Sequence, residues 1–163
     1  MHILIATDAQ WVVNDVVAAL DSPSTTFEIV SNGREVARKV AARTPDIAIL
    51  DMQVGSLGGM AITMDLRLDQ SDGRLPKVPV LMLLDRTADI HMARRSGADG
   101  WTIKPLDSLR LRKAVTQIAA GGCYAEGLPV AELTDEEPVS AGGDATGEES
   151  APESADQSAD SLA

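Results

Sequence analysis

The sequence predicts an α/β fold of the (βα)5 type, in which a doubly wound five-stranded parallel sheet is followed by an extended acidic C-terminal tail. Short apolar runs alternate along residues 1–121 with segments whose apolar residues recur at helical spacing. From residue 122 onward this alternation stops, and Ala, Glu, Asp, Gly, Ser and Pro dominate. Because crossovers between parallel strands are right-handed, an alternating chain of this kind forms a parallel sheet with helices on both faces.

Five apolar runs predict the strands. The run at residues 78–84 is the longest, which suits the centre of a parallel sheet whose strands are buried on both faces. The third run is continuously apolar and ends at Asp51, and the second is followed by the turn residues Asn32 and Gly33. In chain order, the predicted strands are residues 2–6, 27–30, 47–50, 78–84 and 101–103.

The segments between the strands show helical periodicity. After the first strand, Val13, Val16, Val17 and Leu20 recur at the i, i+3, i+4 and i+7 positions of one helix face. Gly97 is suited to end the fourth helix, because glycine accepts the left-handed conformation common at helix C-termini. The remaining predicted helices cover residues 36–40, 60–68, 88–96 and 111–118.

The net charge of −11 is distributed unevenly. Residues 1–121 contain all 14 Lys and Arg residues, whereas residues 122–163 contain 11 acidic residues and no basic one. A nucleic acid would repel this acidic segment, so we expect no nucleic-acid partner. A basic protein surface would attract it.

The acidic segment, residues 122–163, has no periodic apolar face and cannot bury enough surface to offset the entropy of ordering it. We expect it to be disordered alone and to become ordered on a partner, which indicates a larger multisubunit assembly. Its few anchoring side chains are Tyr124, Leu128, Val130, Leu133, Val139 and Leu162.

The single cysteine, Cys123, cannot form an internal disulfide, which fits a reducing compartment. The N-terminus lacks the basic, apolar and small-residue regions of a secretion signal. No stretch approaches the ~18 apolar residues that span a bilayer. We therefore expect a cytoplasmic protein that is not inserted into a membrane.

Charged residues follow several predicted strands. Asp8 comes just after the first, Asp51 directly after the third, Asp85 just after Leu84 of the fourth, and Lys104 directly after the fifth. Because chemistry in such sheets gathers at the carboxyl ends of the strands, we expect these residues at one edge. A single carboxylate there is most often a solvated turn residue, but carboxylates and a lysine together suit a divalent cation and a phosphoryl group.

Four stretches carry a family resemblance: residues 2–8, residues 45–51 with Gly59 beyond them, residues 78–84 and residues 97–105. Over about residues 1–121 the chain resembles a response-regulator receiver domain of the CheY type. The resemblance implies that Asp51 is the phospho-acceptor and that Lys104 pairs with the phosphate. It also implies a weak Mg²⁺ site formed by Asp8, Asp51 and the backbone carbonyl of Gln53, and a cis bond between Lys104 and Pro105.

The sequence also departs from the family pattern. Thr7 replaces the first of two adjacent acids, and Gly55 replaces a loop proline. Leu84 replaces the Ser or Thr whose hydroxyl bonds the phosphoryl group, and Asp85 replaces a small residue, so its charge would repel a phosphoryl dianion. Trp101 stands at the position of the aromatic switch residue. We therefore expect Asp51 to accept phosphate poorly or not at all, and the conformational response to be lost.

Basic residues gather on the fourth and fifth predicted helices. They form either a solvated helix face or a docking surface, because relatives commonly use the face made by the fourth helix, fifth strand and fifth helix for partners; both interpretations stay open. These residues are Arg94, Arg95, Arg110, Arg112 and Lys113.

Two functional hypotheses follow from the sequence. In the first, the chain is an atypical receiver that serves as a protein-interaction module or accessory subunit, with a degenerate aspartate site. In the second, it is a working phospho-switch that takes phosphate from a histidine kinase onto Asp51. An enzyme is disfavoured, because no combination of nucleophile, base and oxyanion donors is apparent. No DNA-binding helix-turn-helix is recognisable after the receiver region.

Overall fold

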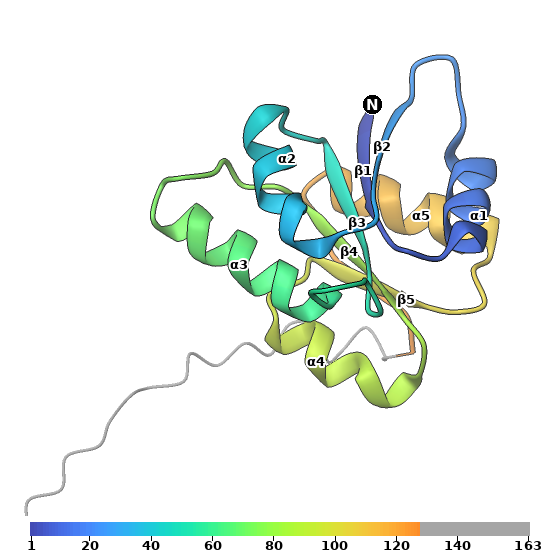
Figure 1. Ribbon diagram of the computed structural model, residues 1–163. Coiled ribbons are helices and arrows are strands. Elements are labelled where there is room, and N and C mark those ends of the chain that lie inside the picture. The colour runs from blue at the N-terminus through green and yellow to red at the C-terminus, as the bar shows by residue number, and fades with distance from the viewer. Residues whose placement is uncertain (128–163) are drawn as a thin grey trace, which may run out of the picture.

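The computed structural model describes residues 1–127, and these form a single parallel sheet with helices on both faces (Figure 1). The strand order is β2-β1-β3-β4-β5-β6. The strands are β1 (His2–Ala6), β2 (Thr26–Val30), β3 (Ile47–Asp51), β4 (Val80–Leu84), β5 (Gly100–Ile103) and β6 (Tyr124–Ala125). The helices are α1 (Gln10–Leu20), α2 (Val36–Ala42), α3 (Gly59–Ser71), α4 (Ile90–Arg95) and α5 (Ser108–Ala119), with two short 3₁₀ turns, η1 (Gly33–Glu35) and η2 (Thr87–Asp89).

The side chains of β1 and β3 alternate between two apolar layers. In β1, Ile3 and Ile5 pack against α1 and α5, whereas Leu4 and Ala6 pack against α2 and α3. Helix α4 covers a third cluster on the same side as α2 and α3, beyond β4 (Figure 1). Strands β1, β3 and β4 are buried at every position, which explains why the sequence shows them as continuous apolar runs.

Three helix ends follow the local chemistry of the sequence. Gly97 and Gly121 adopt φ values of +79° and +84°, and they follow the C-termini of α4 and α5, as expected of glycine at these positions. At the start of α5, the Asp107 carboxylate accepts hydrogen bonds from the backbone N–H groups of Leu109 and Arg110. Asp107 thereby satisfies two of the donors that a helix N-terminus leaves free.

The sheet has one strand more than the sequence predicted. Strand β6 lies parallel to β5, with Tyr124 opposite Gly100 and Ala125 opposite Trp101. The fold therefore continues past the predicted boundary at residue 121. A strand of only two residues carries no periodic apolar pattern, so pattern analysis missed it. The remaining acidic segment, with the predicted anchors Leu128, Val130, Leu133, Val139 and Leu162, lies outside the described residues.

The strand order reverses direction between β1 and β3, and the C-terminal ends of β1, β3, β4 and β5 therefore meet at one edge. We call this edge the rim. None of the helices within residues 1–127 is long and apolar enough to cross a membrane.

The alternation of buried and exposed positions on α5 gives a direct test of the core. Leu111 is fully buried, whereas Leu109, two residues earlier on the same helix, is 78% exposed. Leu111→Ala is expected to lower the free energy of unfolding by ~2–5 kcal/mol, because it opens a cavity. Leu109→Ala, the matched control, is expected to change it by less than ~0.5 kcal/mol. Urea denaturation measures both, and equal losses would contradict this packing of α5.

Candidate functional site

An aspartate–lysine pair lies at the centre of the rim. Asp51 ends β3 with only 1% of its surface exposed, and Lys104 follows β5 directly. The Lys104 ammonium lies 2.6 Å from Asp51 Oδ1. The Lys104 amide extends the β4–β5 pairing by donating to the carbonyl of Leu84, and the Lys104–Pro105 bond is cis, as the resemblance implies. The buried carboxylate is therefore neutralised by a cation that the sheet itself positions.

Both oxygens of the Asp51 carboxylate accept hydrogen bonds from the protein. The Thr7 hydroxyl donates to Oδ2 at 2.8 Å, and the backbone N–H of Gln53 donates to Oδ1 at 3.1 Å. The Thr7 oxygen in turn accepts from the amide of Ala9. Thr7 is thus buried as a hydrogen-bonding partner of the aspartate, at the position where the family pattern places an acid.

A second carboxylate shares the lysine. Asp85 Oδ1 lies 3.0 Å from the Lys104 ammonium. The ammonium also lies 5.6 Å from the centre of the Trp11 ring, within range of a cation–π interaction. Asp51, Asp85 and Trp11 therefore surround one positive charge, and we refer to Asp51, Lys104 and Asp85 as the charged triad.

Asp8 lies at the same rim but is exposed. One of its carboxylate oxygens would lie 3.3 Å from a Cβ built on Gly55, so Asp8 faces the loop that follows β3. Ser56 in this loop has a φ of 70° and donates a hydrogen bond to Asn32 Oδ1, and the Gly33 amide donates to the carbonyl of Gly55. The loop beside Asp8 is therefore held by the turn after β2.

The oxygen donors of the rim fit a loosely held Mg²⁺ ion. Magnesium in proteins accepts one or two carboxylates and keeps several waters, which Asp8 and Asp51 could satisfy. Within residues 1–127 no group of three His, Cys, Asp or Glu side chains is arranged to hold a metal. Thr7 and Lys104 compete for the oxygens of Asp51, and the carbonyl of Gln53 stays a predicted ligand.

Leu84 and Trp101 lie on the other side of the sheet from the charged triad. Leu84 is fully buried in a cluster with Met82, Ile90, Ala93 and Trp101. Asp51 pairs in register with Leu83 rather than Leu84, and Leu83 belongs to the α1–α5 layer. Leu84 therefore ends its strand at the rim, but its side chain faces α4 and does not lie beside the ammonium of Lys104 as the sequence had led us to expect.

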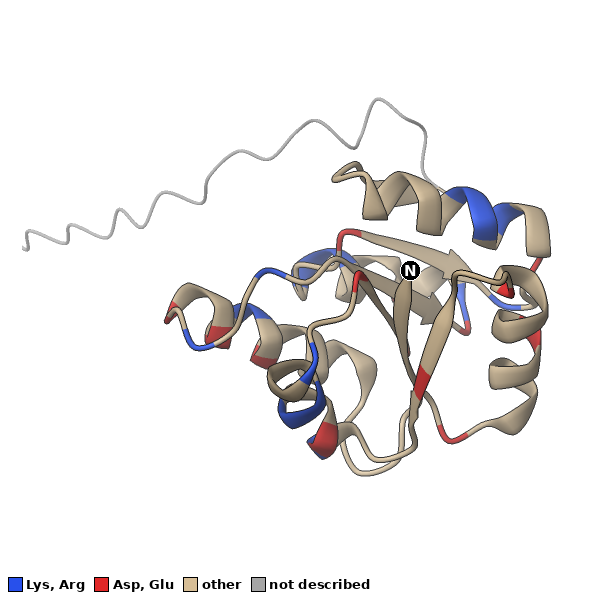
Figure 2. Cartoon of the chain, turned by 90° about the horizontal axis from the view of Figure 1, so that it is seen from above, with Lys and Arg blue, Asp and Glu red and all other residues tan. Residues whose placement is uncertain are grey.

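The five basic residues of α4 and α5 are exposed, and Figure 2 shows basic positions along α5. Three of them already have partners in the chain. Arg110 pairs with Glu126 and with Asp107, Arg112 donates to the carbonyl of Ala19, and Arg94 has an interaction of its own. The two others are Arg95 and Lys113.

Glu126 is a site residue that the sequence analysis missed. It follows β6 and binds side chains of β5 and α5, although the sequence shows it only as one of many acidic residues beyond residue 121. Nothing in the local pattern distinguishes Glu126 from the other acids, because its partners lie far from it in the sequence.

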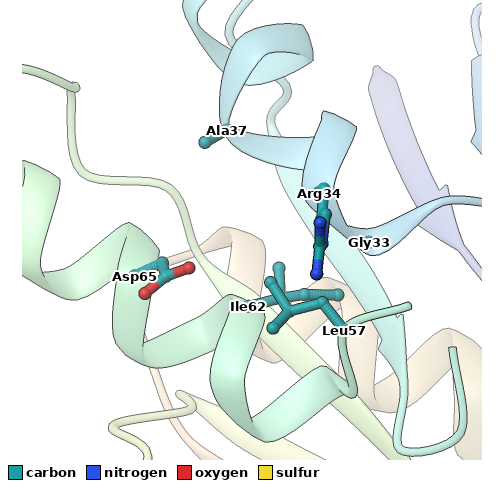
Figure 3. Close-up of a pocket in the computed structure, with 6 residues that line it drawn as sticks. All are labelled: Gly33, Arg34, Ala37, Leu57, Ile62 and Asp65. Atoms are coloured by element: carbon teal, nitrogen blue, oxygen red, sulfur yellow. The ribbon is translucent and has the colours of Figure 1, made fainter. Parts of the chain in front are cut away.

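A shallow pocket of about 230 Å³ opens between η1 and α3 (Figure 3). Arg34 and Asp65 lie on opposite sides of it, and Leu57, from the loop after β3, and Ile62 form its floor. It takes in none of the residues of the charged triad.

Comparison with known proteins identifies the relatives of this chain. The model of the response regulator receiver domain matches residues 3–116. The transcriptional regulatory protein DegU of Brevibacillus brevis is 30% identical over 101 residues, which are 60% of this chain and 42% of DegU. The chain spans about half the length of the curated relatives it matches.

Solved structures agree with the family match. The signal receiver domain of a histidine kinase from Syntrophus aciditrophicus has a TM-score of 0.65 and 26% identity, and the match covers 80% of this chain and 98% of that domain. The receiver domain of the sensor histidine kinase PA1611 from Pseudomonas aeruginosa has a TM-score of 0.61 and 21% identity over 73% of this chain and 97% of that domain. That structure contains a magnesium ion in its active-site cleft.

The residue at position 7 gives a test of the predicted metal site. Thr7→Asp is expected to tighten Mg²⁺ binding by about tenfold, because a second charged oxygen ligand joins Asp8 beside Asp51. Thr7→Val, which has the same shape without an oxygen, is the matched control and is expected to bind Mg²⁺ more weakly than Thr7→Asp. Isothermal titration with MgCl₂ measures both. Equal affinities for the two variants would contradict a metal site at Asp8 and Asp51.

Proposed function

The chain belongs to the response regulator receiver domain family, and on this premise we propose that it acts as a protein-interaction module whose aspartate accepts phosphate poorly. In this role it serves as an accessory subunit of a larger protein assembly. Receiver domains are signalling domains of two-component systems rather than typical enzymes. The proposal therefore concerns which steps of receiver signalling this chain retains.

The observation that carries the proposal is the position of Asp85 beside Lys104. A phosphoryl group on Asp51 would bring negative charge to the ammonium that Asp85 already contacts at 3.0 Å. At an effective dielectric of about 20, two unit charges about 4 Å apart interact by about 4 kcal/mol. The aspartyl phosphate would therefore be destabilised by Asp85, or would have to displace it.

The end of β4 supports the loss of a conformational response. A hydroxyl side chain at the end of β4 would offer a phosphoryl group a hydrogen-bond donor, whereas Leu84 has none and faces α4. Leu84 is instead packed among Met82, Ile90 and Trp101. Moving a fully buried leucine out of such a cluster costs ~2–5 kcal/mol, and no new bond would offset that cost.

The partner surface in this proposal combines the acidic C-terminal segment with the face formed by α4, β5 and α5. Residues 122–163 carry negative charge without any basic residue, and Arg95 and Lys113 provide exposed positive charge on the folded part. Such a combination suits a protein partner with charges of both signs, rather than a nucleic acid.

The alternative function is a working phospho-switch that takes phosphate from a histidine kinase. The close contact between Lys104 and Asp51, at 2.6 Å, favours this alternative, because it provides the acceptor and the cation that a phosphoryl group requires. The two functions differ in whether Asp51 is readily phosphorylated and in whether the surroundings of Trp101 change when it is.

Acetyl phosphate separates the two functions. In the reaction, an oxygen of Asp51 attacks phosphorus, acetate leaves, and an aspartyl phosphate forms. With Mg²⁺ present, we expect slow and incomplete modification by intact mass. Asp85→Ala is expected to speed it by at least about tenfold, because one repelling charge is removed.

Asp51→Asn is the control for that experiment, because it removes the attacking carboxylate and is expected to show no mass change. Rapid, stoichiometric modification of the unaltered chain, together with a large change in Trp101 fluorescence in a Trp11→Phe variant, would favour the phospho-switch and overturn the proposal. An Asp85→Ala variant no faster than the parent would remove Asp85 as the cause of poor phosphorylation.

The role of the acidic segment is tested by ending the chain after Gly127, the last residue that the structure describes. We expect the melting temperature to stay unchanged, since β6 and the packed layers remain intact. Recovery of partner proteins in a pull-down is expected to fall sharply. Equal recovery with and without residues 128–163 would show that the segment does not contribute to partner binding.

A further inference from the structure

Residues 124–127, which we call the strap, run along the outer edge of β5. The Tyr124 amide donates to the carbonyl of Asp99, and the Glu126 amide donates to the carbonyl of Trp101 at 3.3 Å. Gly100 is essential to this approach, because a Cβ there would lie 2.4 Å from the Tyr124 carbonyl oxygen. The edge of β5 that faces outward in a five-stranded sheet is thus covered by the chain's own C-terminal segment.

The Glu126 carboxylate anchors the strap. It accepts hydrogen bonds from the Thr102 hydroxyl and from the backbone N–H of Ile103, the latter at 3.1 Å, and forms an ion pair with Arg110 of α5. Its side chain is only 15% exposed. Charge-assisted hydrogen bonds of this kind are about twice as strong as neutral ones. One side chain therefore ties the strap to both β5 and α5.

The strap also holds Trp101. The indole N–H of Trp101 donates to the Glu126 carbonyl at 3.0 Å, and only 4% of the residue is exposed. On its other side the ring belongs to the cluster with Leu84 and α4. The indole has a single donor, and the strap satisfies it. An indole that turned outward would lose both this hydrogen bond and the apolar contacts.

Two further observations, at the two ends of the strap, agree with its packing against the fold. Gly127 has a φ of +86°, a conformation that glycine adopts without strain, and it lies against Ile90 and Ile103. Burial raises the pKa of the Tyr124 phenol, and the negative charge of Glu126 adds to the rise. Tyr124 is thus partly withdrawn from water where the strap begins.

We propose that the strap fixes Trp101 in its buried position. The C-terminal segment, rather than Asp51, then determines whether the Trp101 ring on β5 stays packed against α4. The inference is independent of whether Asp51 accepts phosphate, because none of the strap contacts involves the charged triad. Residue 128 begins the remaining acidic segment directly after the strap. A partner that binds this segment would act on the chain immediately beyond the group that holds Trp101.

The test uses the full chain with Trp11→Phe, so that Trp101 is the only tryptophan. In this background Glu126→Ala is expected to increase acrylamide quenching of Trp101 fluorescence. It is also expected to speed hydrogen exchange of the Ile103 amide by about fivefold or more, because that amide loses its acceptor. Glu126→Gln, which keeps a carbonyl acceptor and loses the ion pair, is expected to fall between Glu126→Ala and the parent.

Two comparisons complete the test. Gly100→Ala crowds the strap from the β5 side and is expected to increase Trp101 quenching as Glu126→Ala does. Asp51→Asn is expected to leave the quenching at the parent value. The proposal is overturned by unchanged quenching and exchange in Glu126→Ala, or by an Asp51→Asn variant that exposes Trp101 as much as Glu126→Ala does.

Discussion

The ammonium of Lys104 is the charge on which the rim depends. Asp51 is almost fully buried, and a buried carboxylate without a paired cation would be strongly destabilising. The sheet provides the cation at 2.6 Å, and Thr7 supplies a hydrogen bond to the remaining oxygen. The same ammonium contacts Asp85, so one positive charge stabilises two negative ones. The rim therefore already places two carboxylates around one ammonium before any phosphoryl group arrives.

Asp51 and Trp101 lie on opposite faces of the sheet. Asp51 and Leu83 lie in register, and Leu83 packs on the α1–α5 side. Leu84 and Trp101 pack together on the α4 side. A polar residue at the end of β4 could join the two sides through a hydrogen bond to a phosphoryl group. Leucine has no hydrogen-bond donor, and the proposed loss of a response at the aromatic ring rests on this.

The C-terminal end of the fold supplies Trp101 with a different set of partners. Glu126 holds the indole through its carbonyl and holds β5 and Arg110 through its carboxylate. These contacts use the outer edge of β5, which a five-stranded sheet would leave open to other chains. Residues that follow α5 therefore form part of the face made by α4, β5 and α5. On this face, Arg110 is already paired with Glu126.

The sequence by itself determined the alternation of strands and helices and the meeting of Asp51 with Lys104, because parallel strands bring their C-terminal ends to one edge whatever the details of packing. It also identified Leu84 as unable to relay a hydrogen bond, since that depends on residue type alone. Only the tertiary structure decided that Leu84 faces α4, that Thr7 bonds Asp51, and that Glu126 holds Trp101. These contacts join residues far apart in the chain, and they depend on strand register and on a strand too short to leave a periodic pattern.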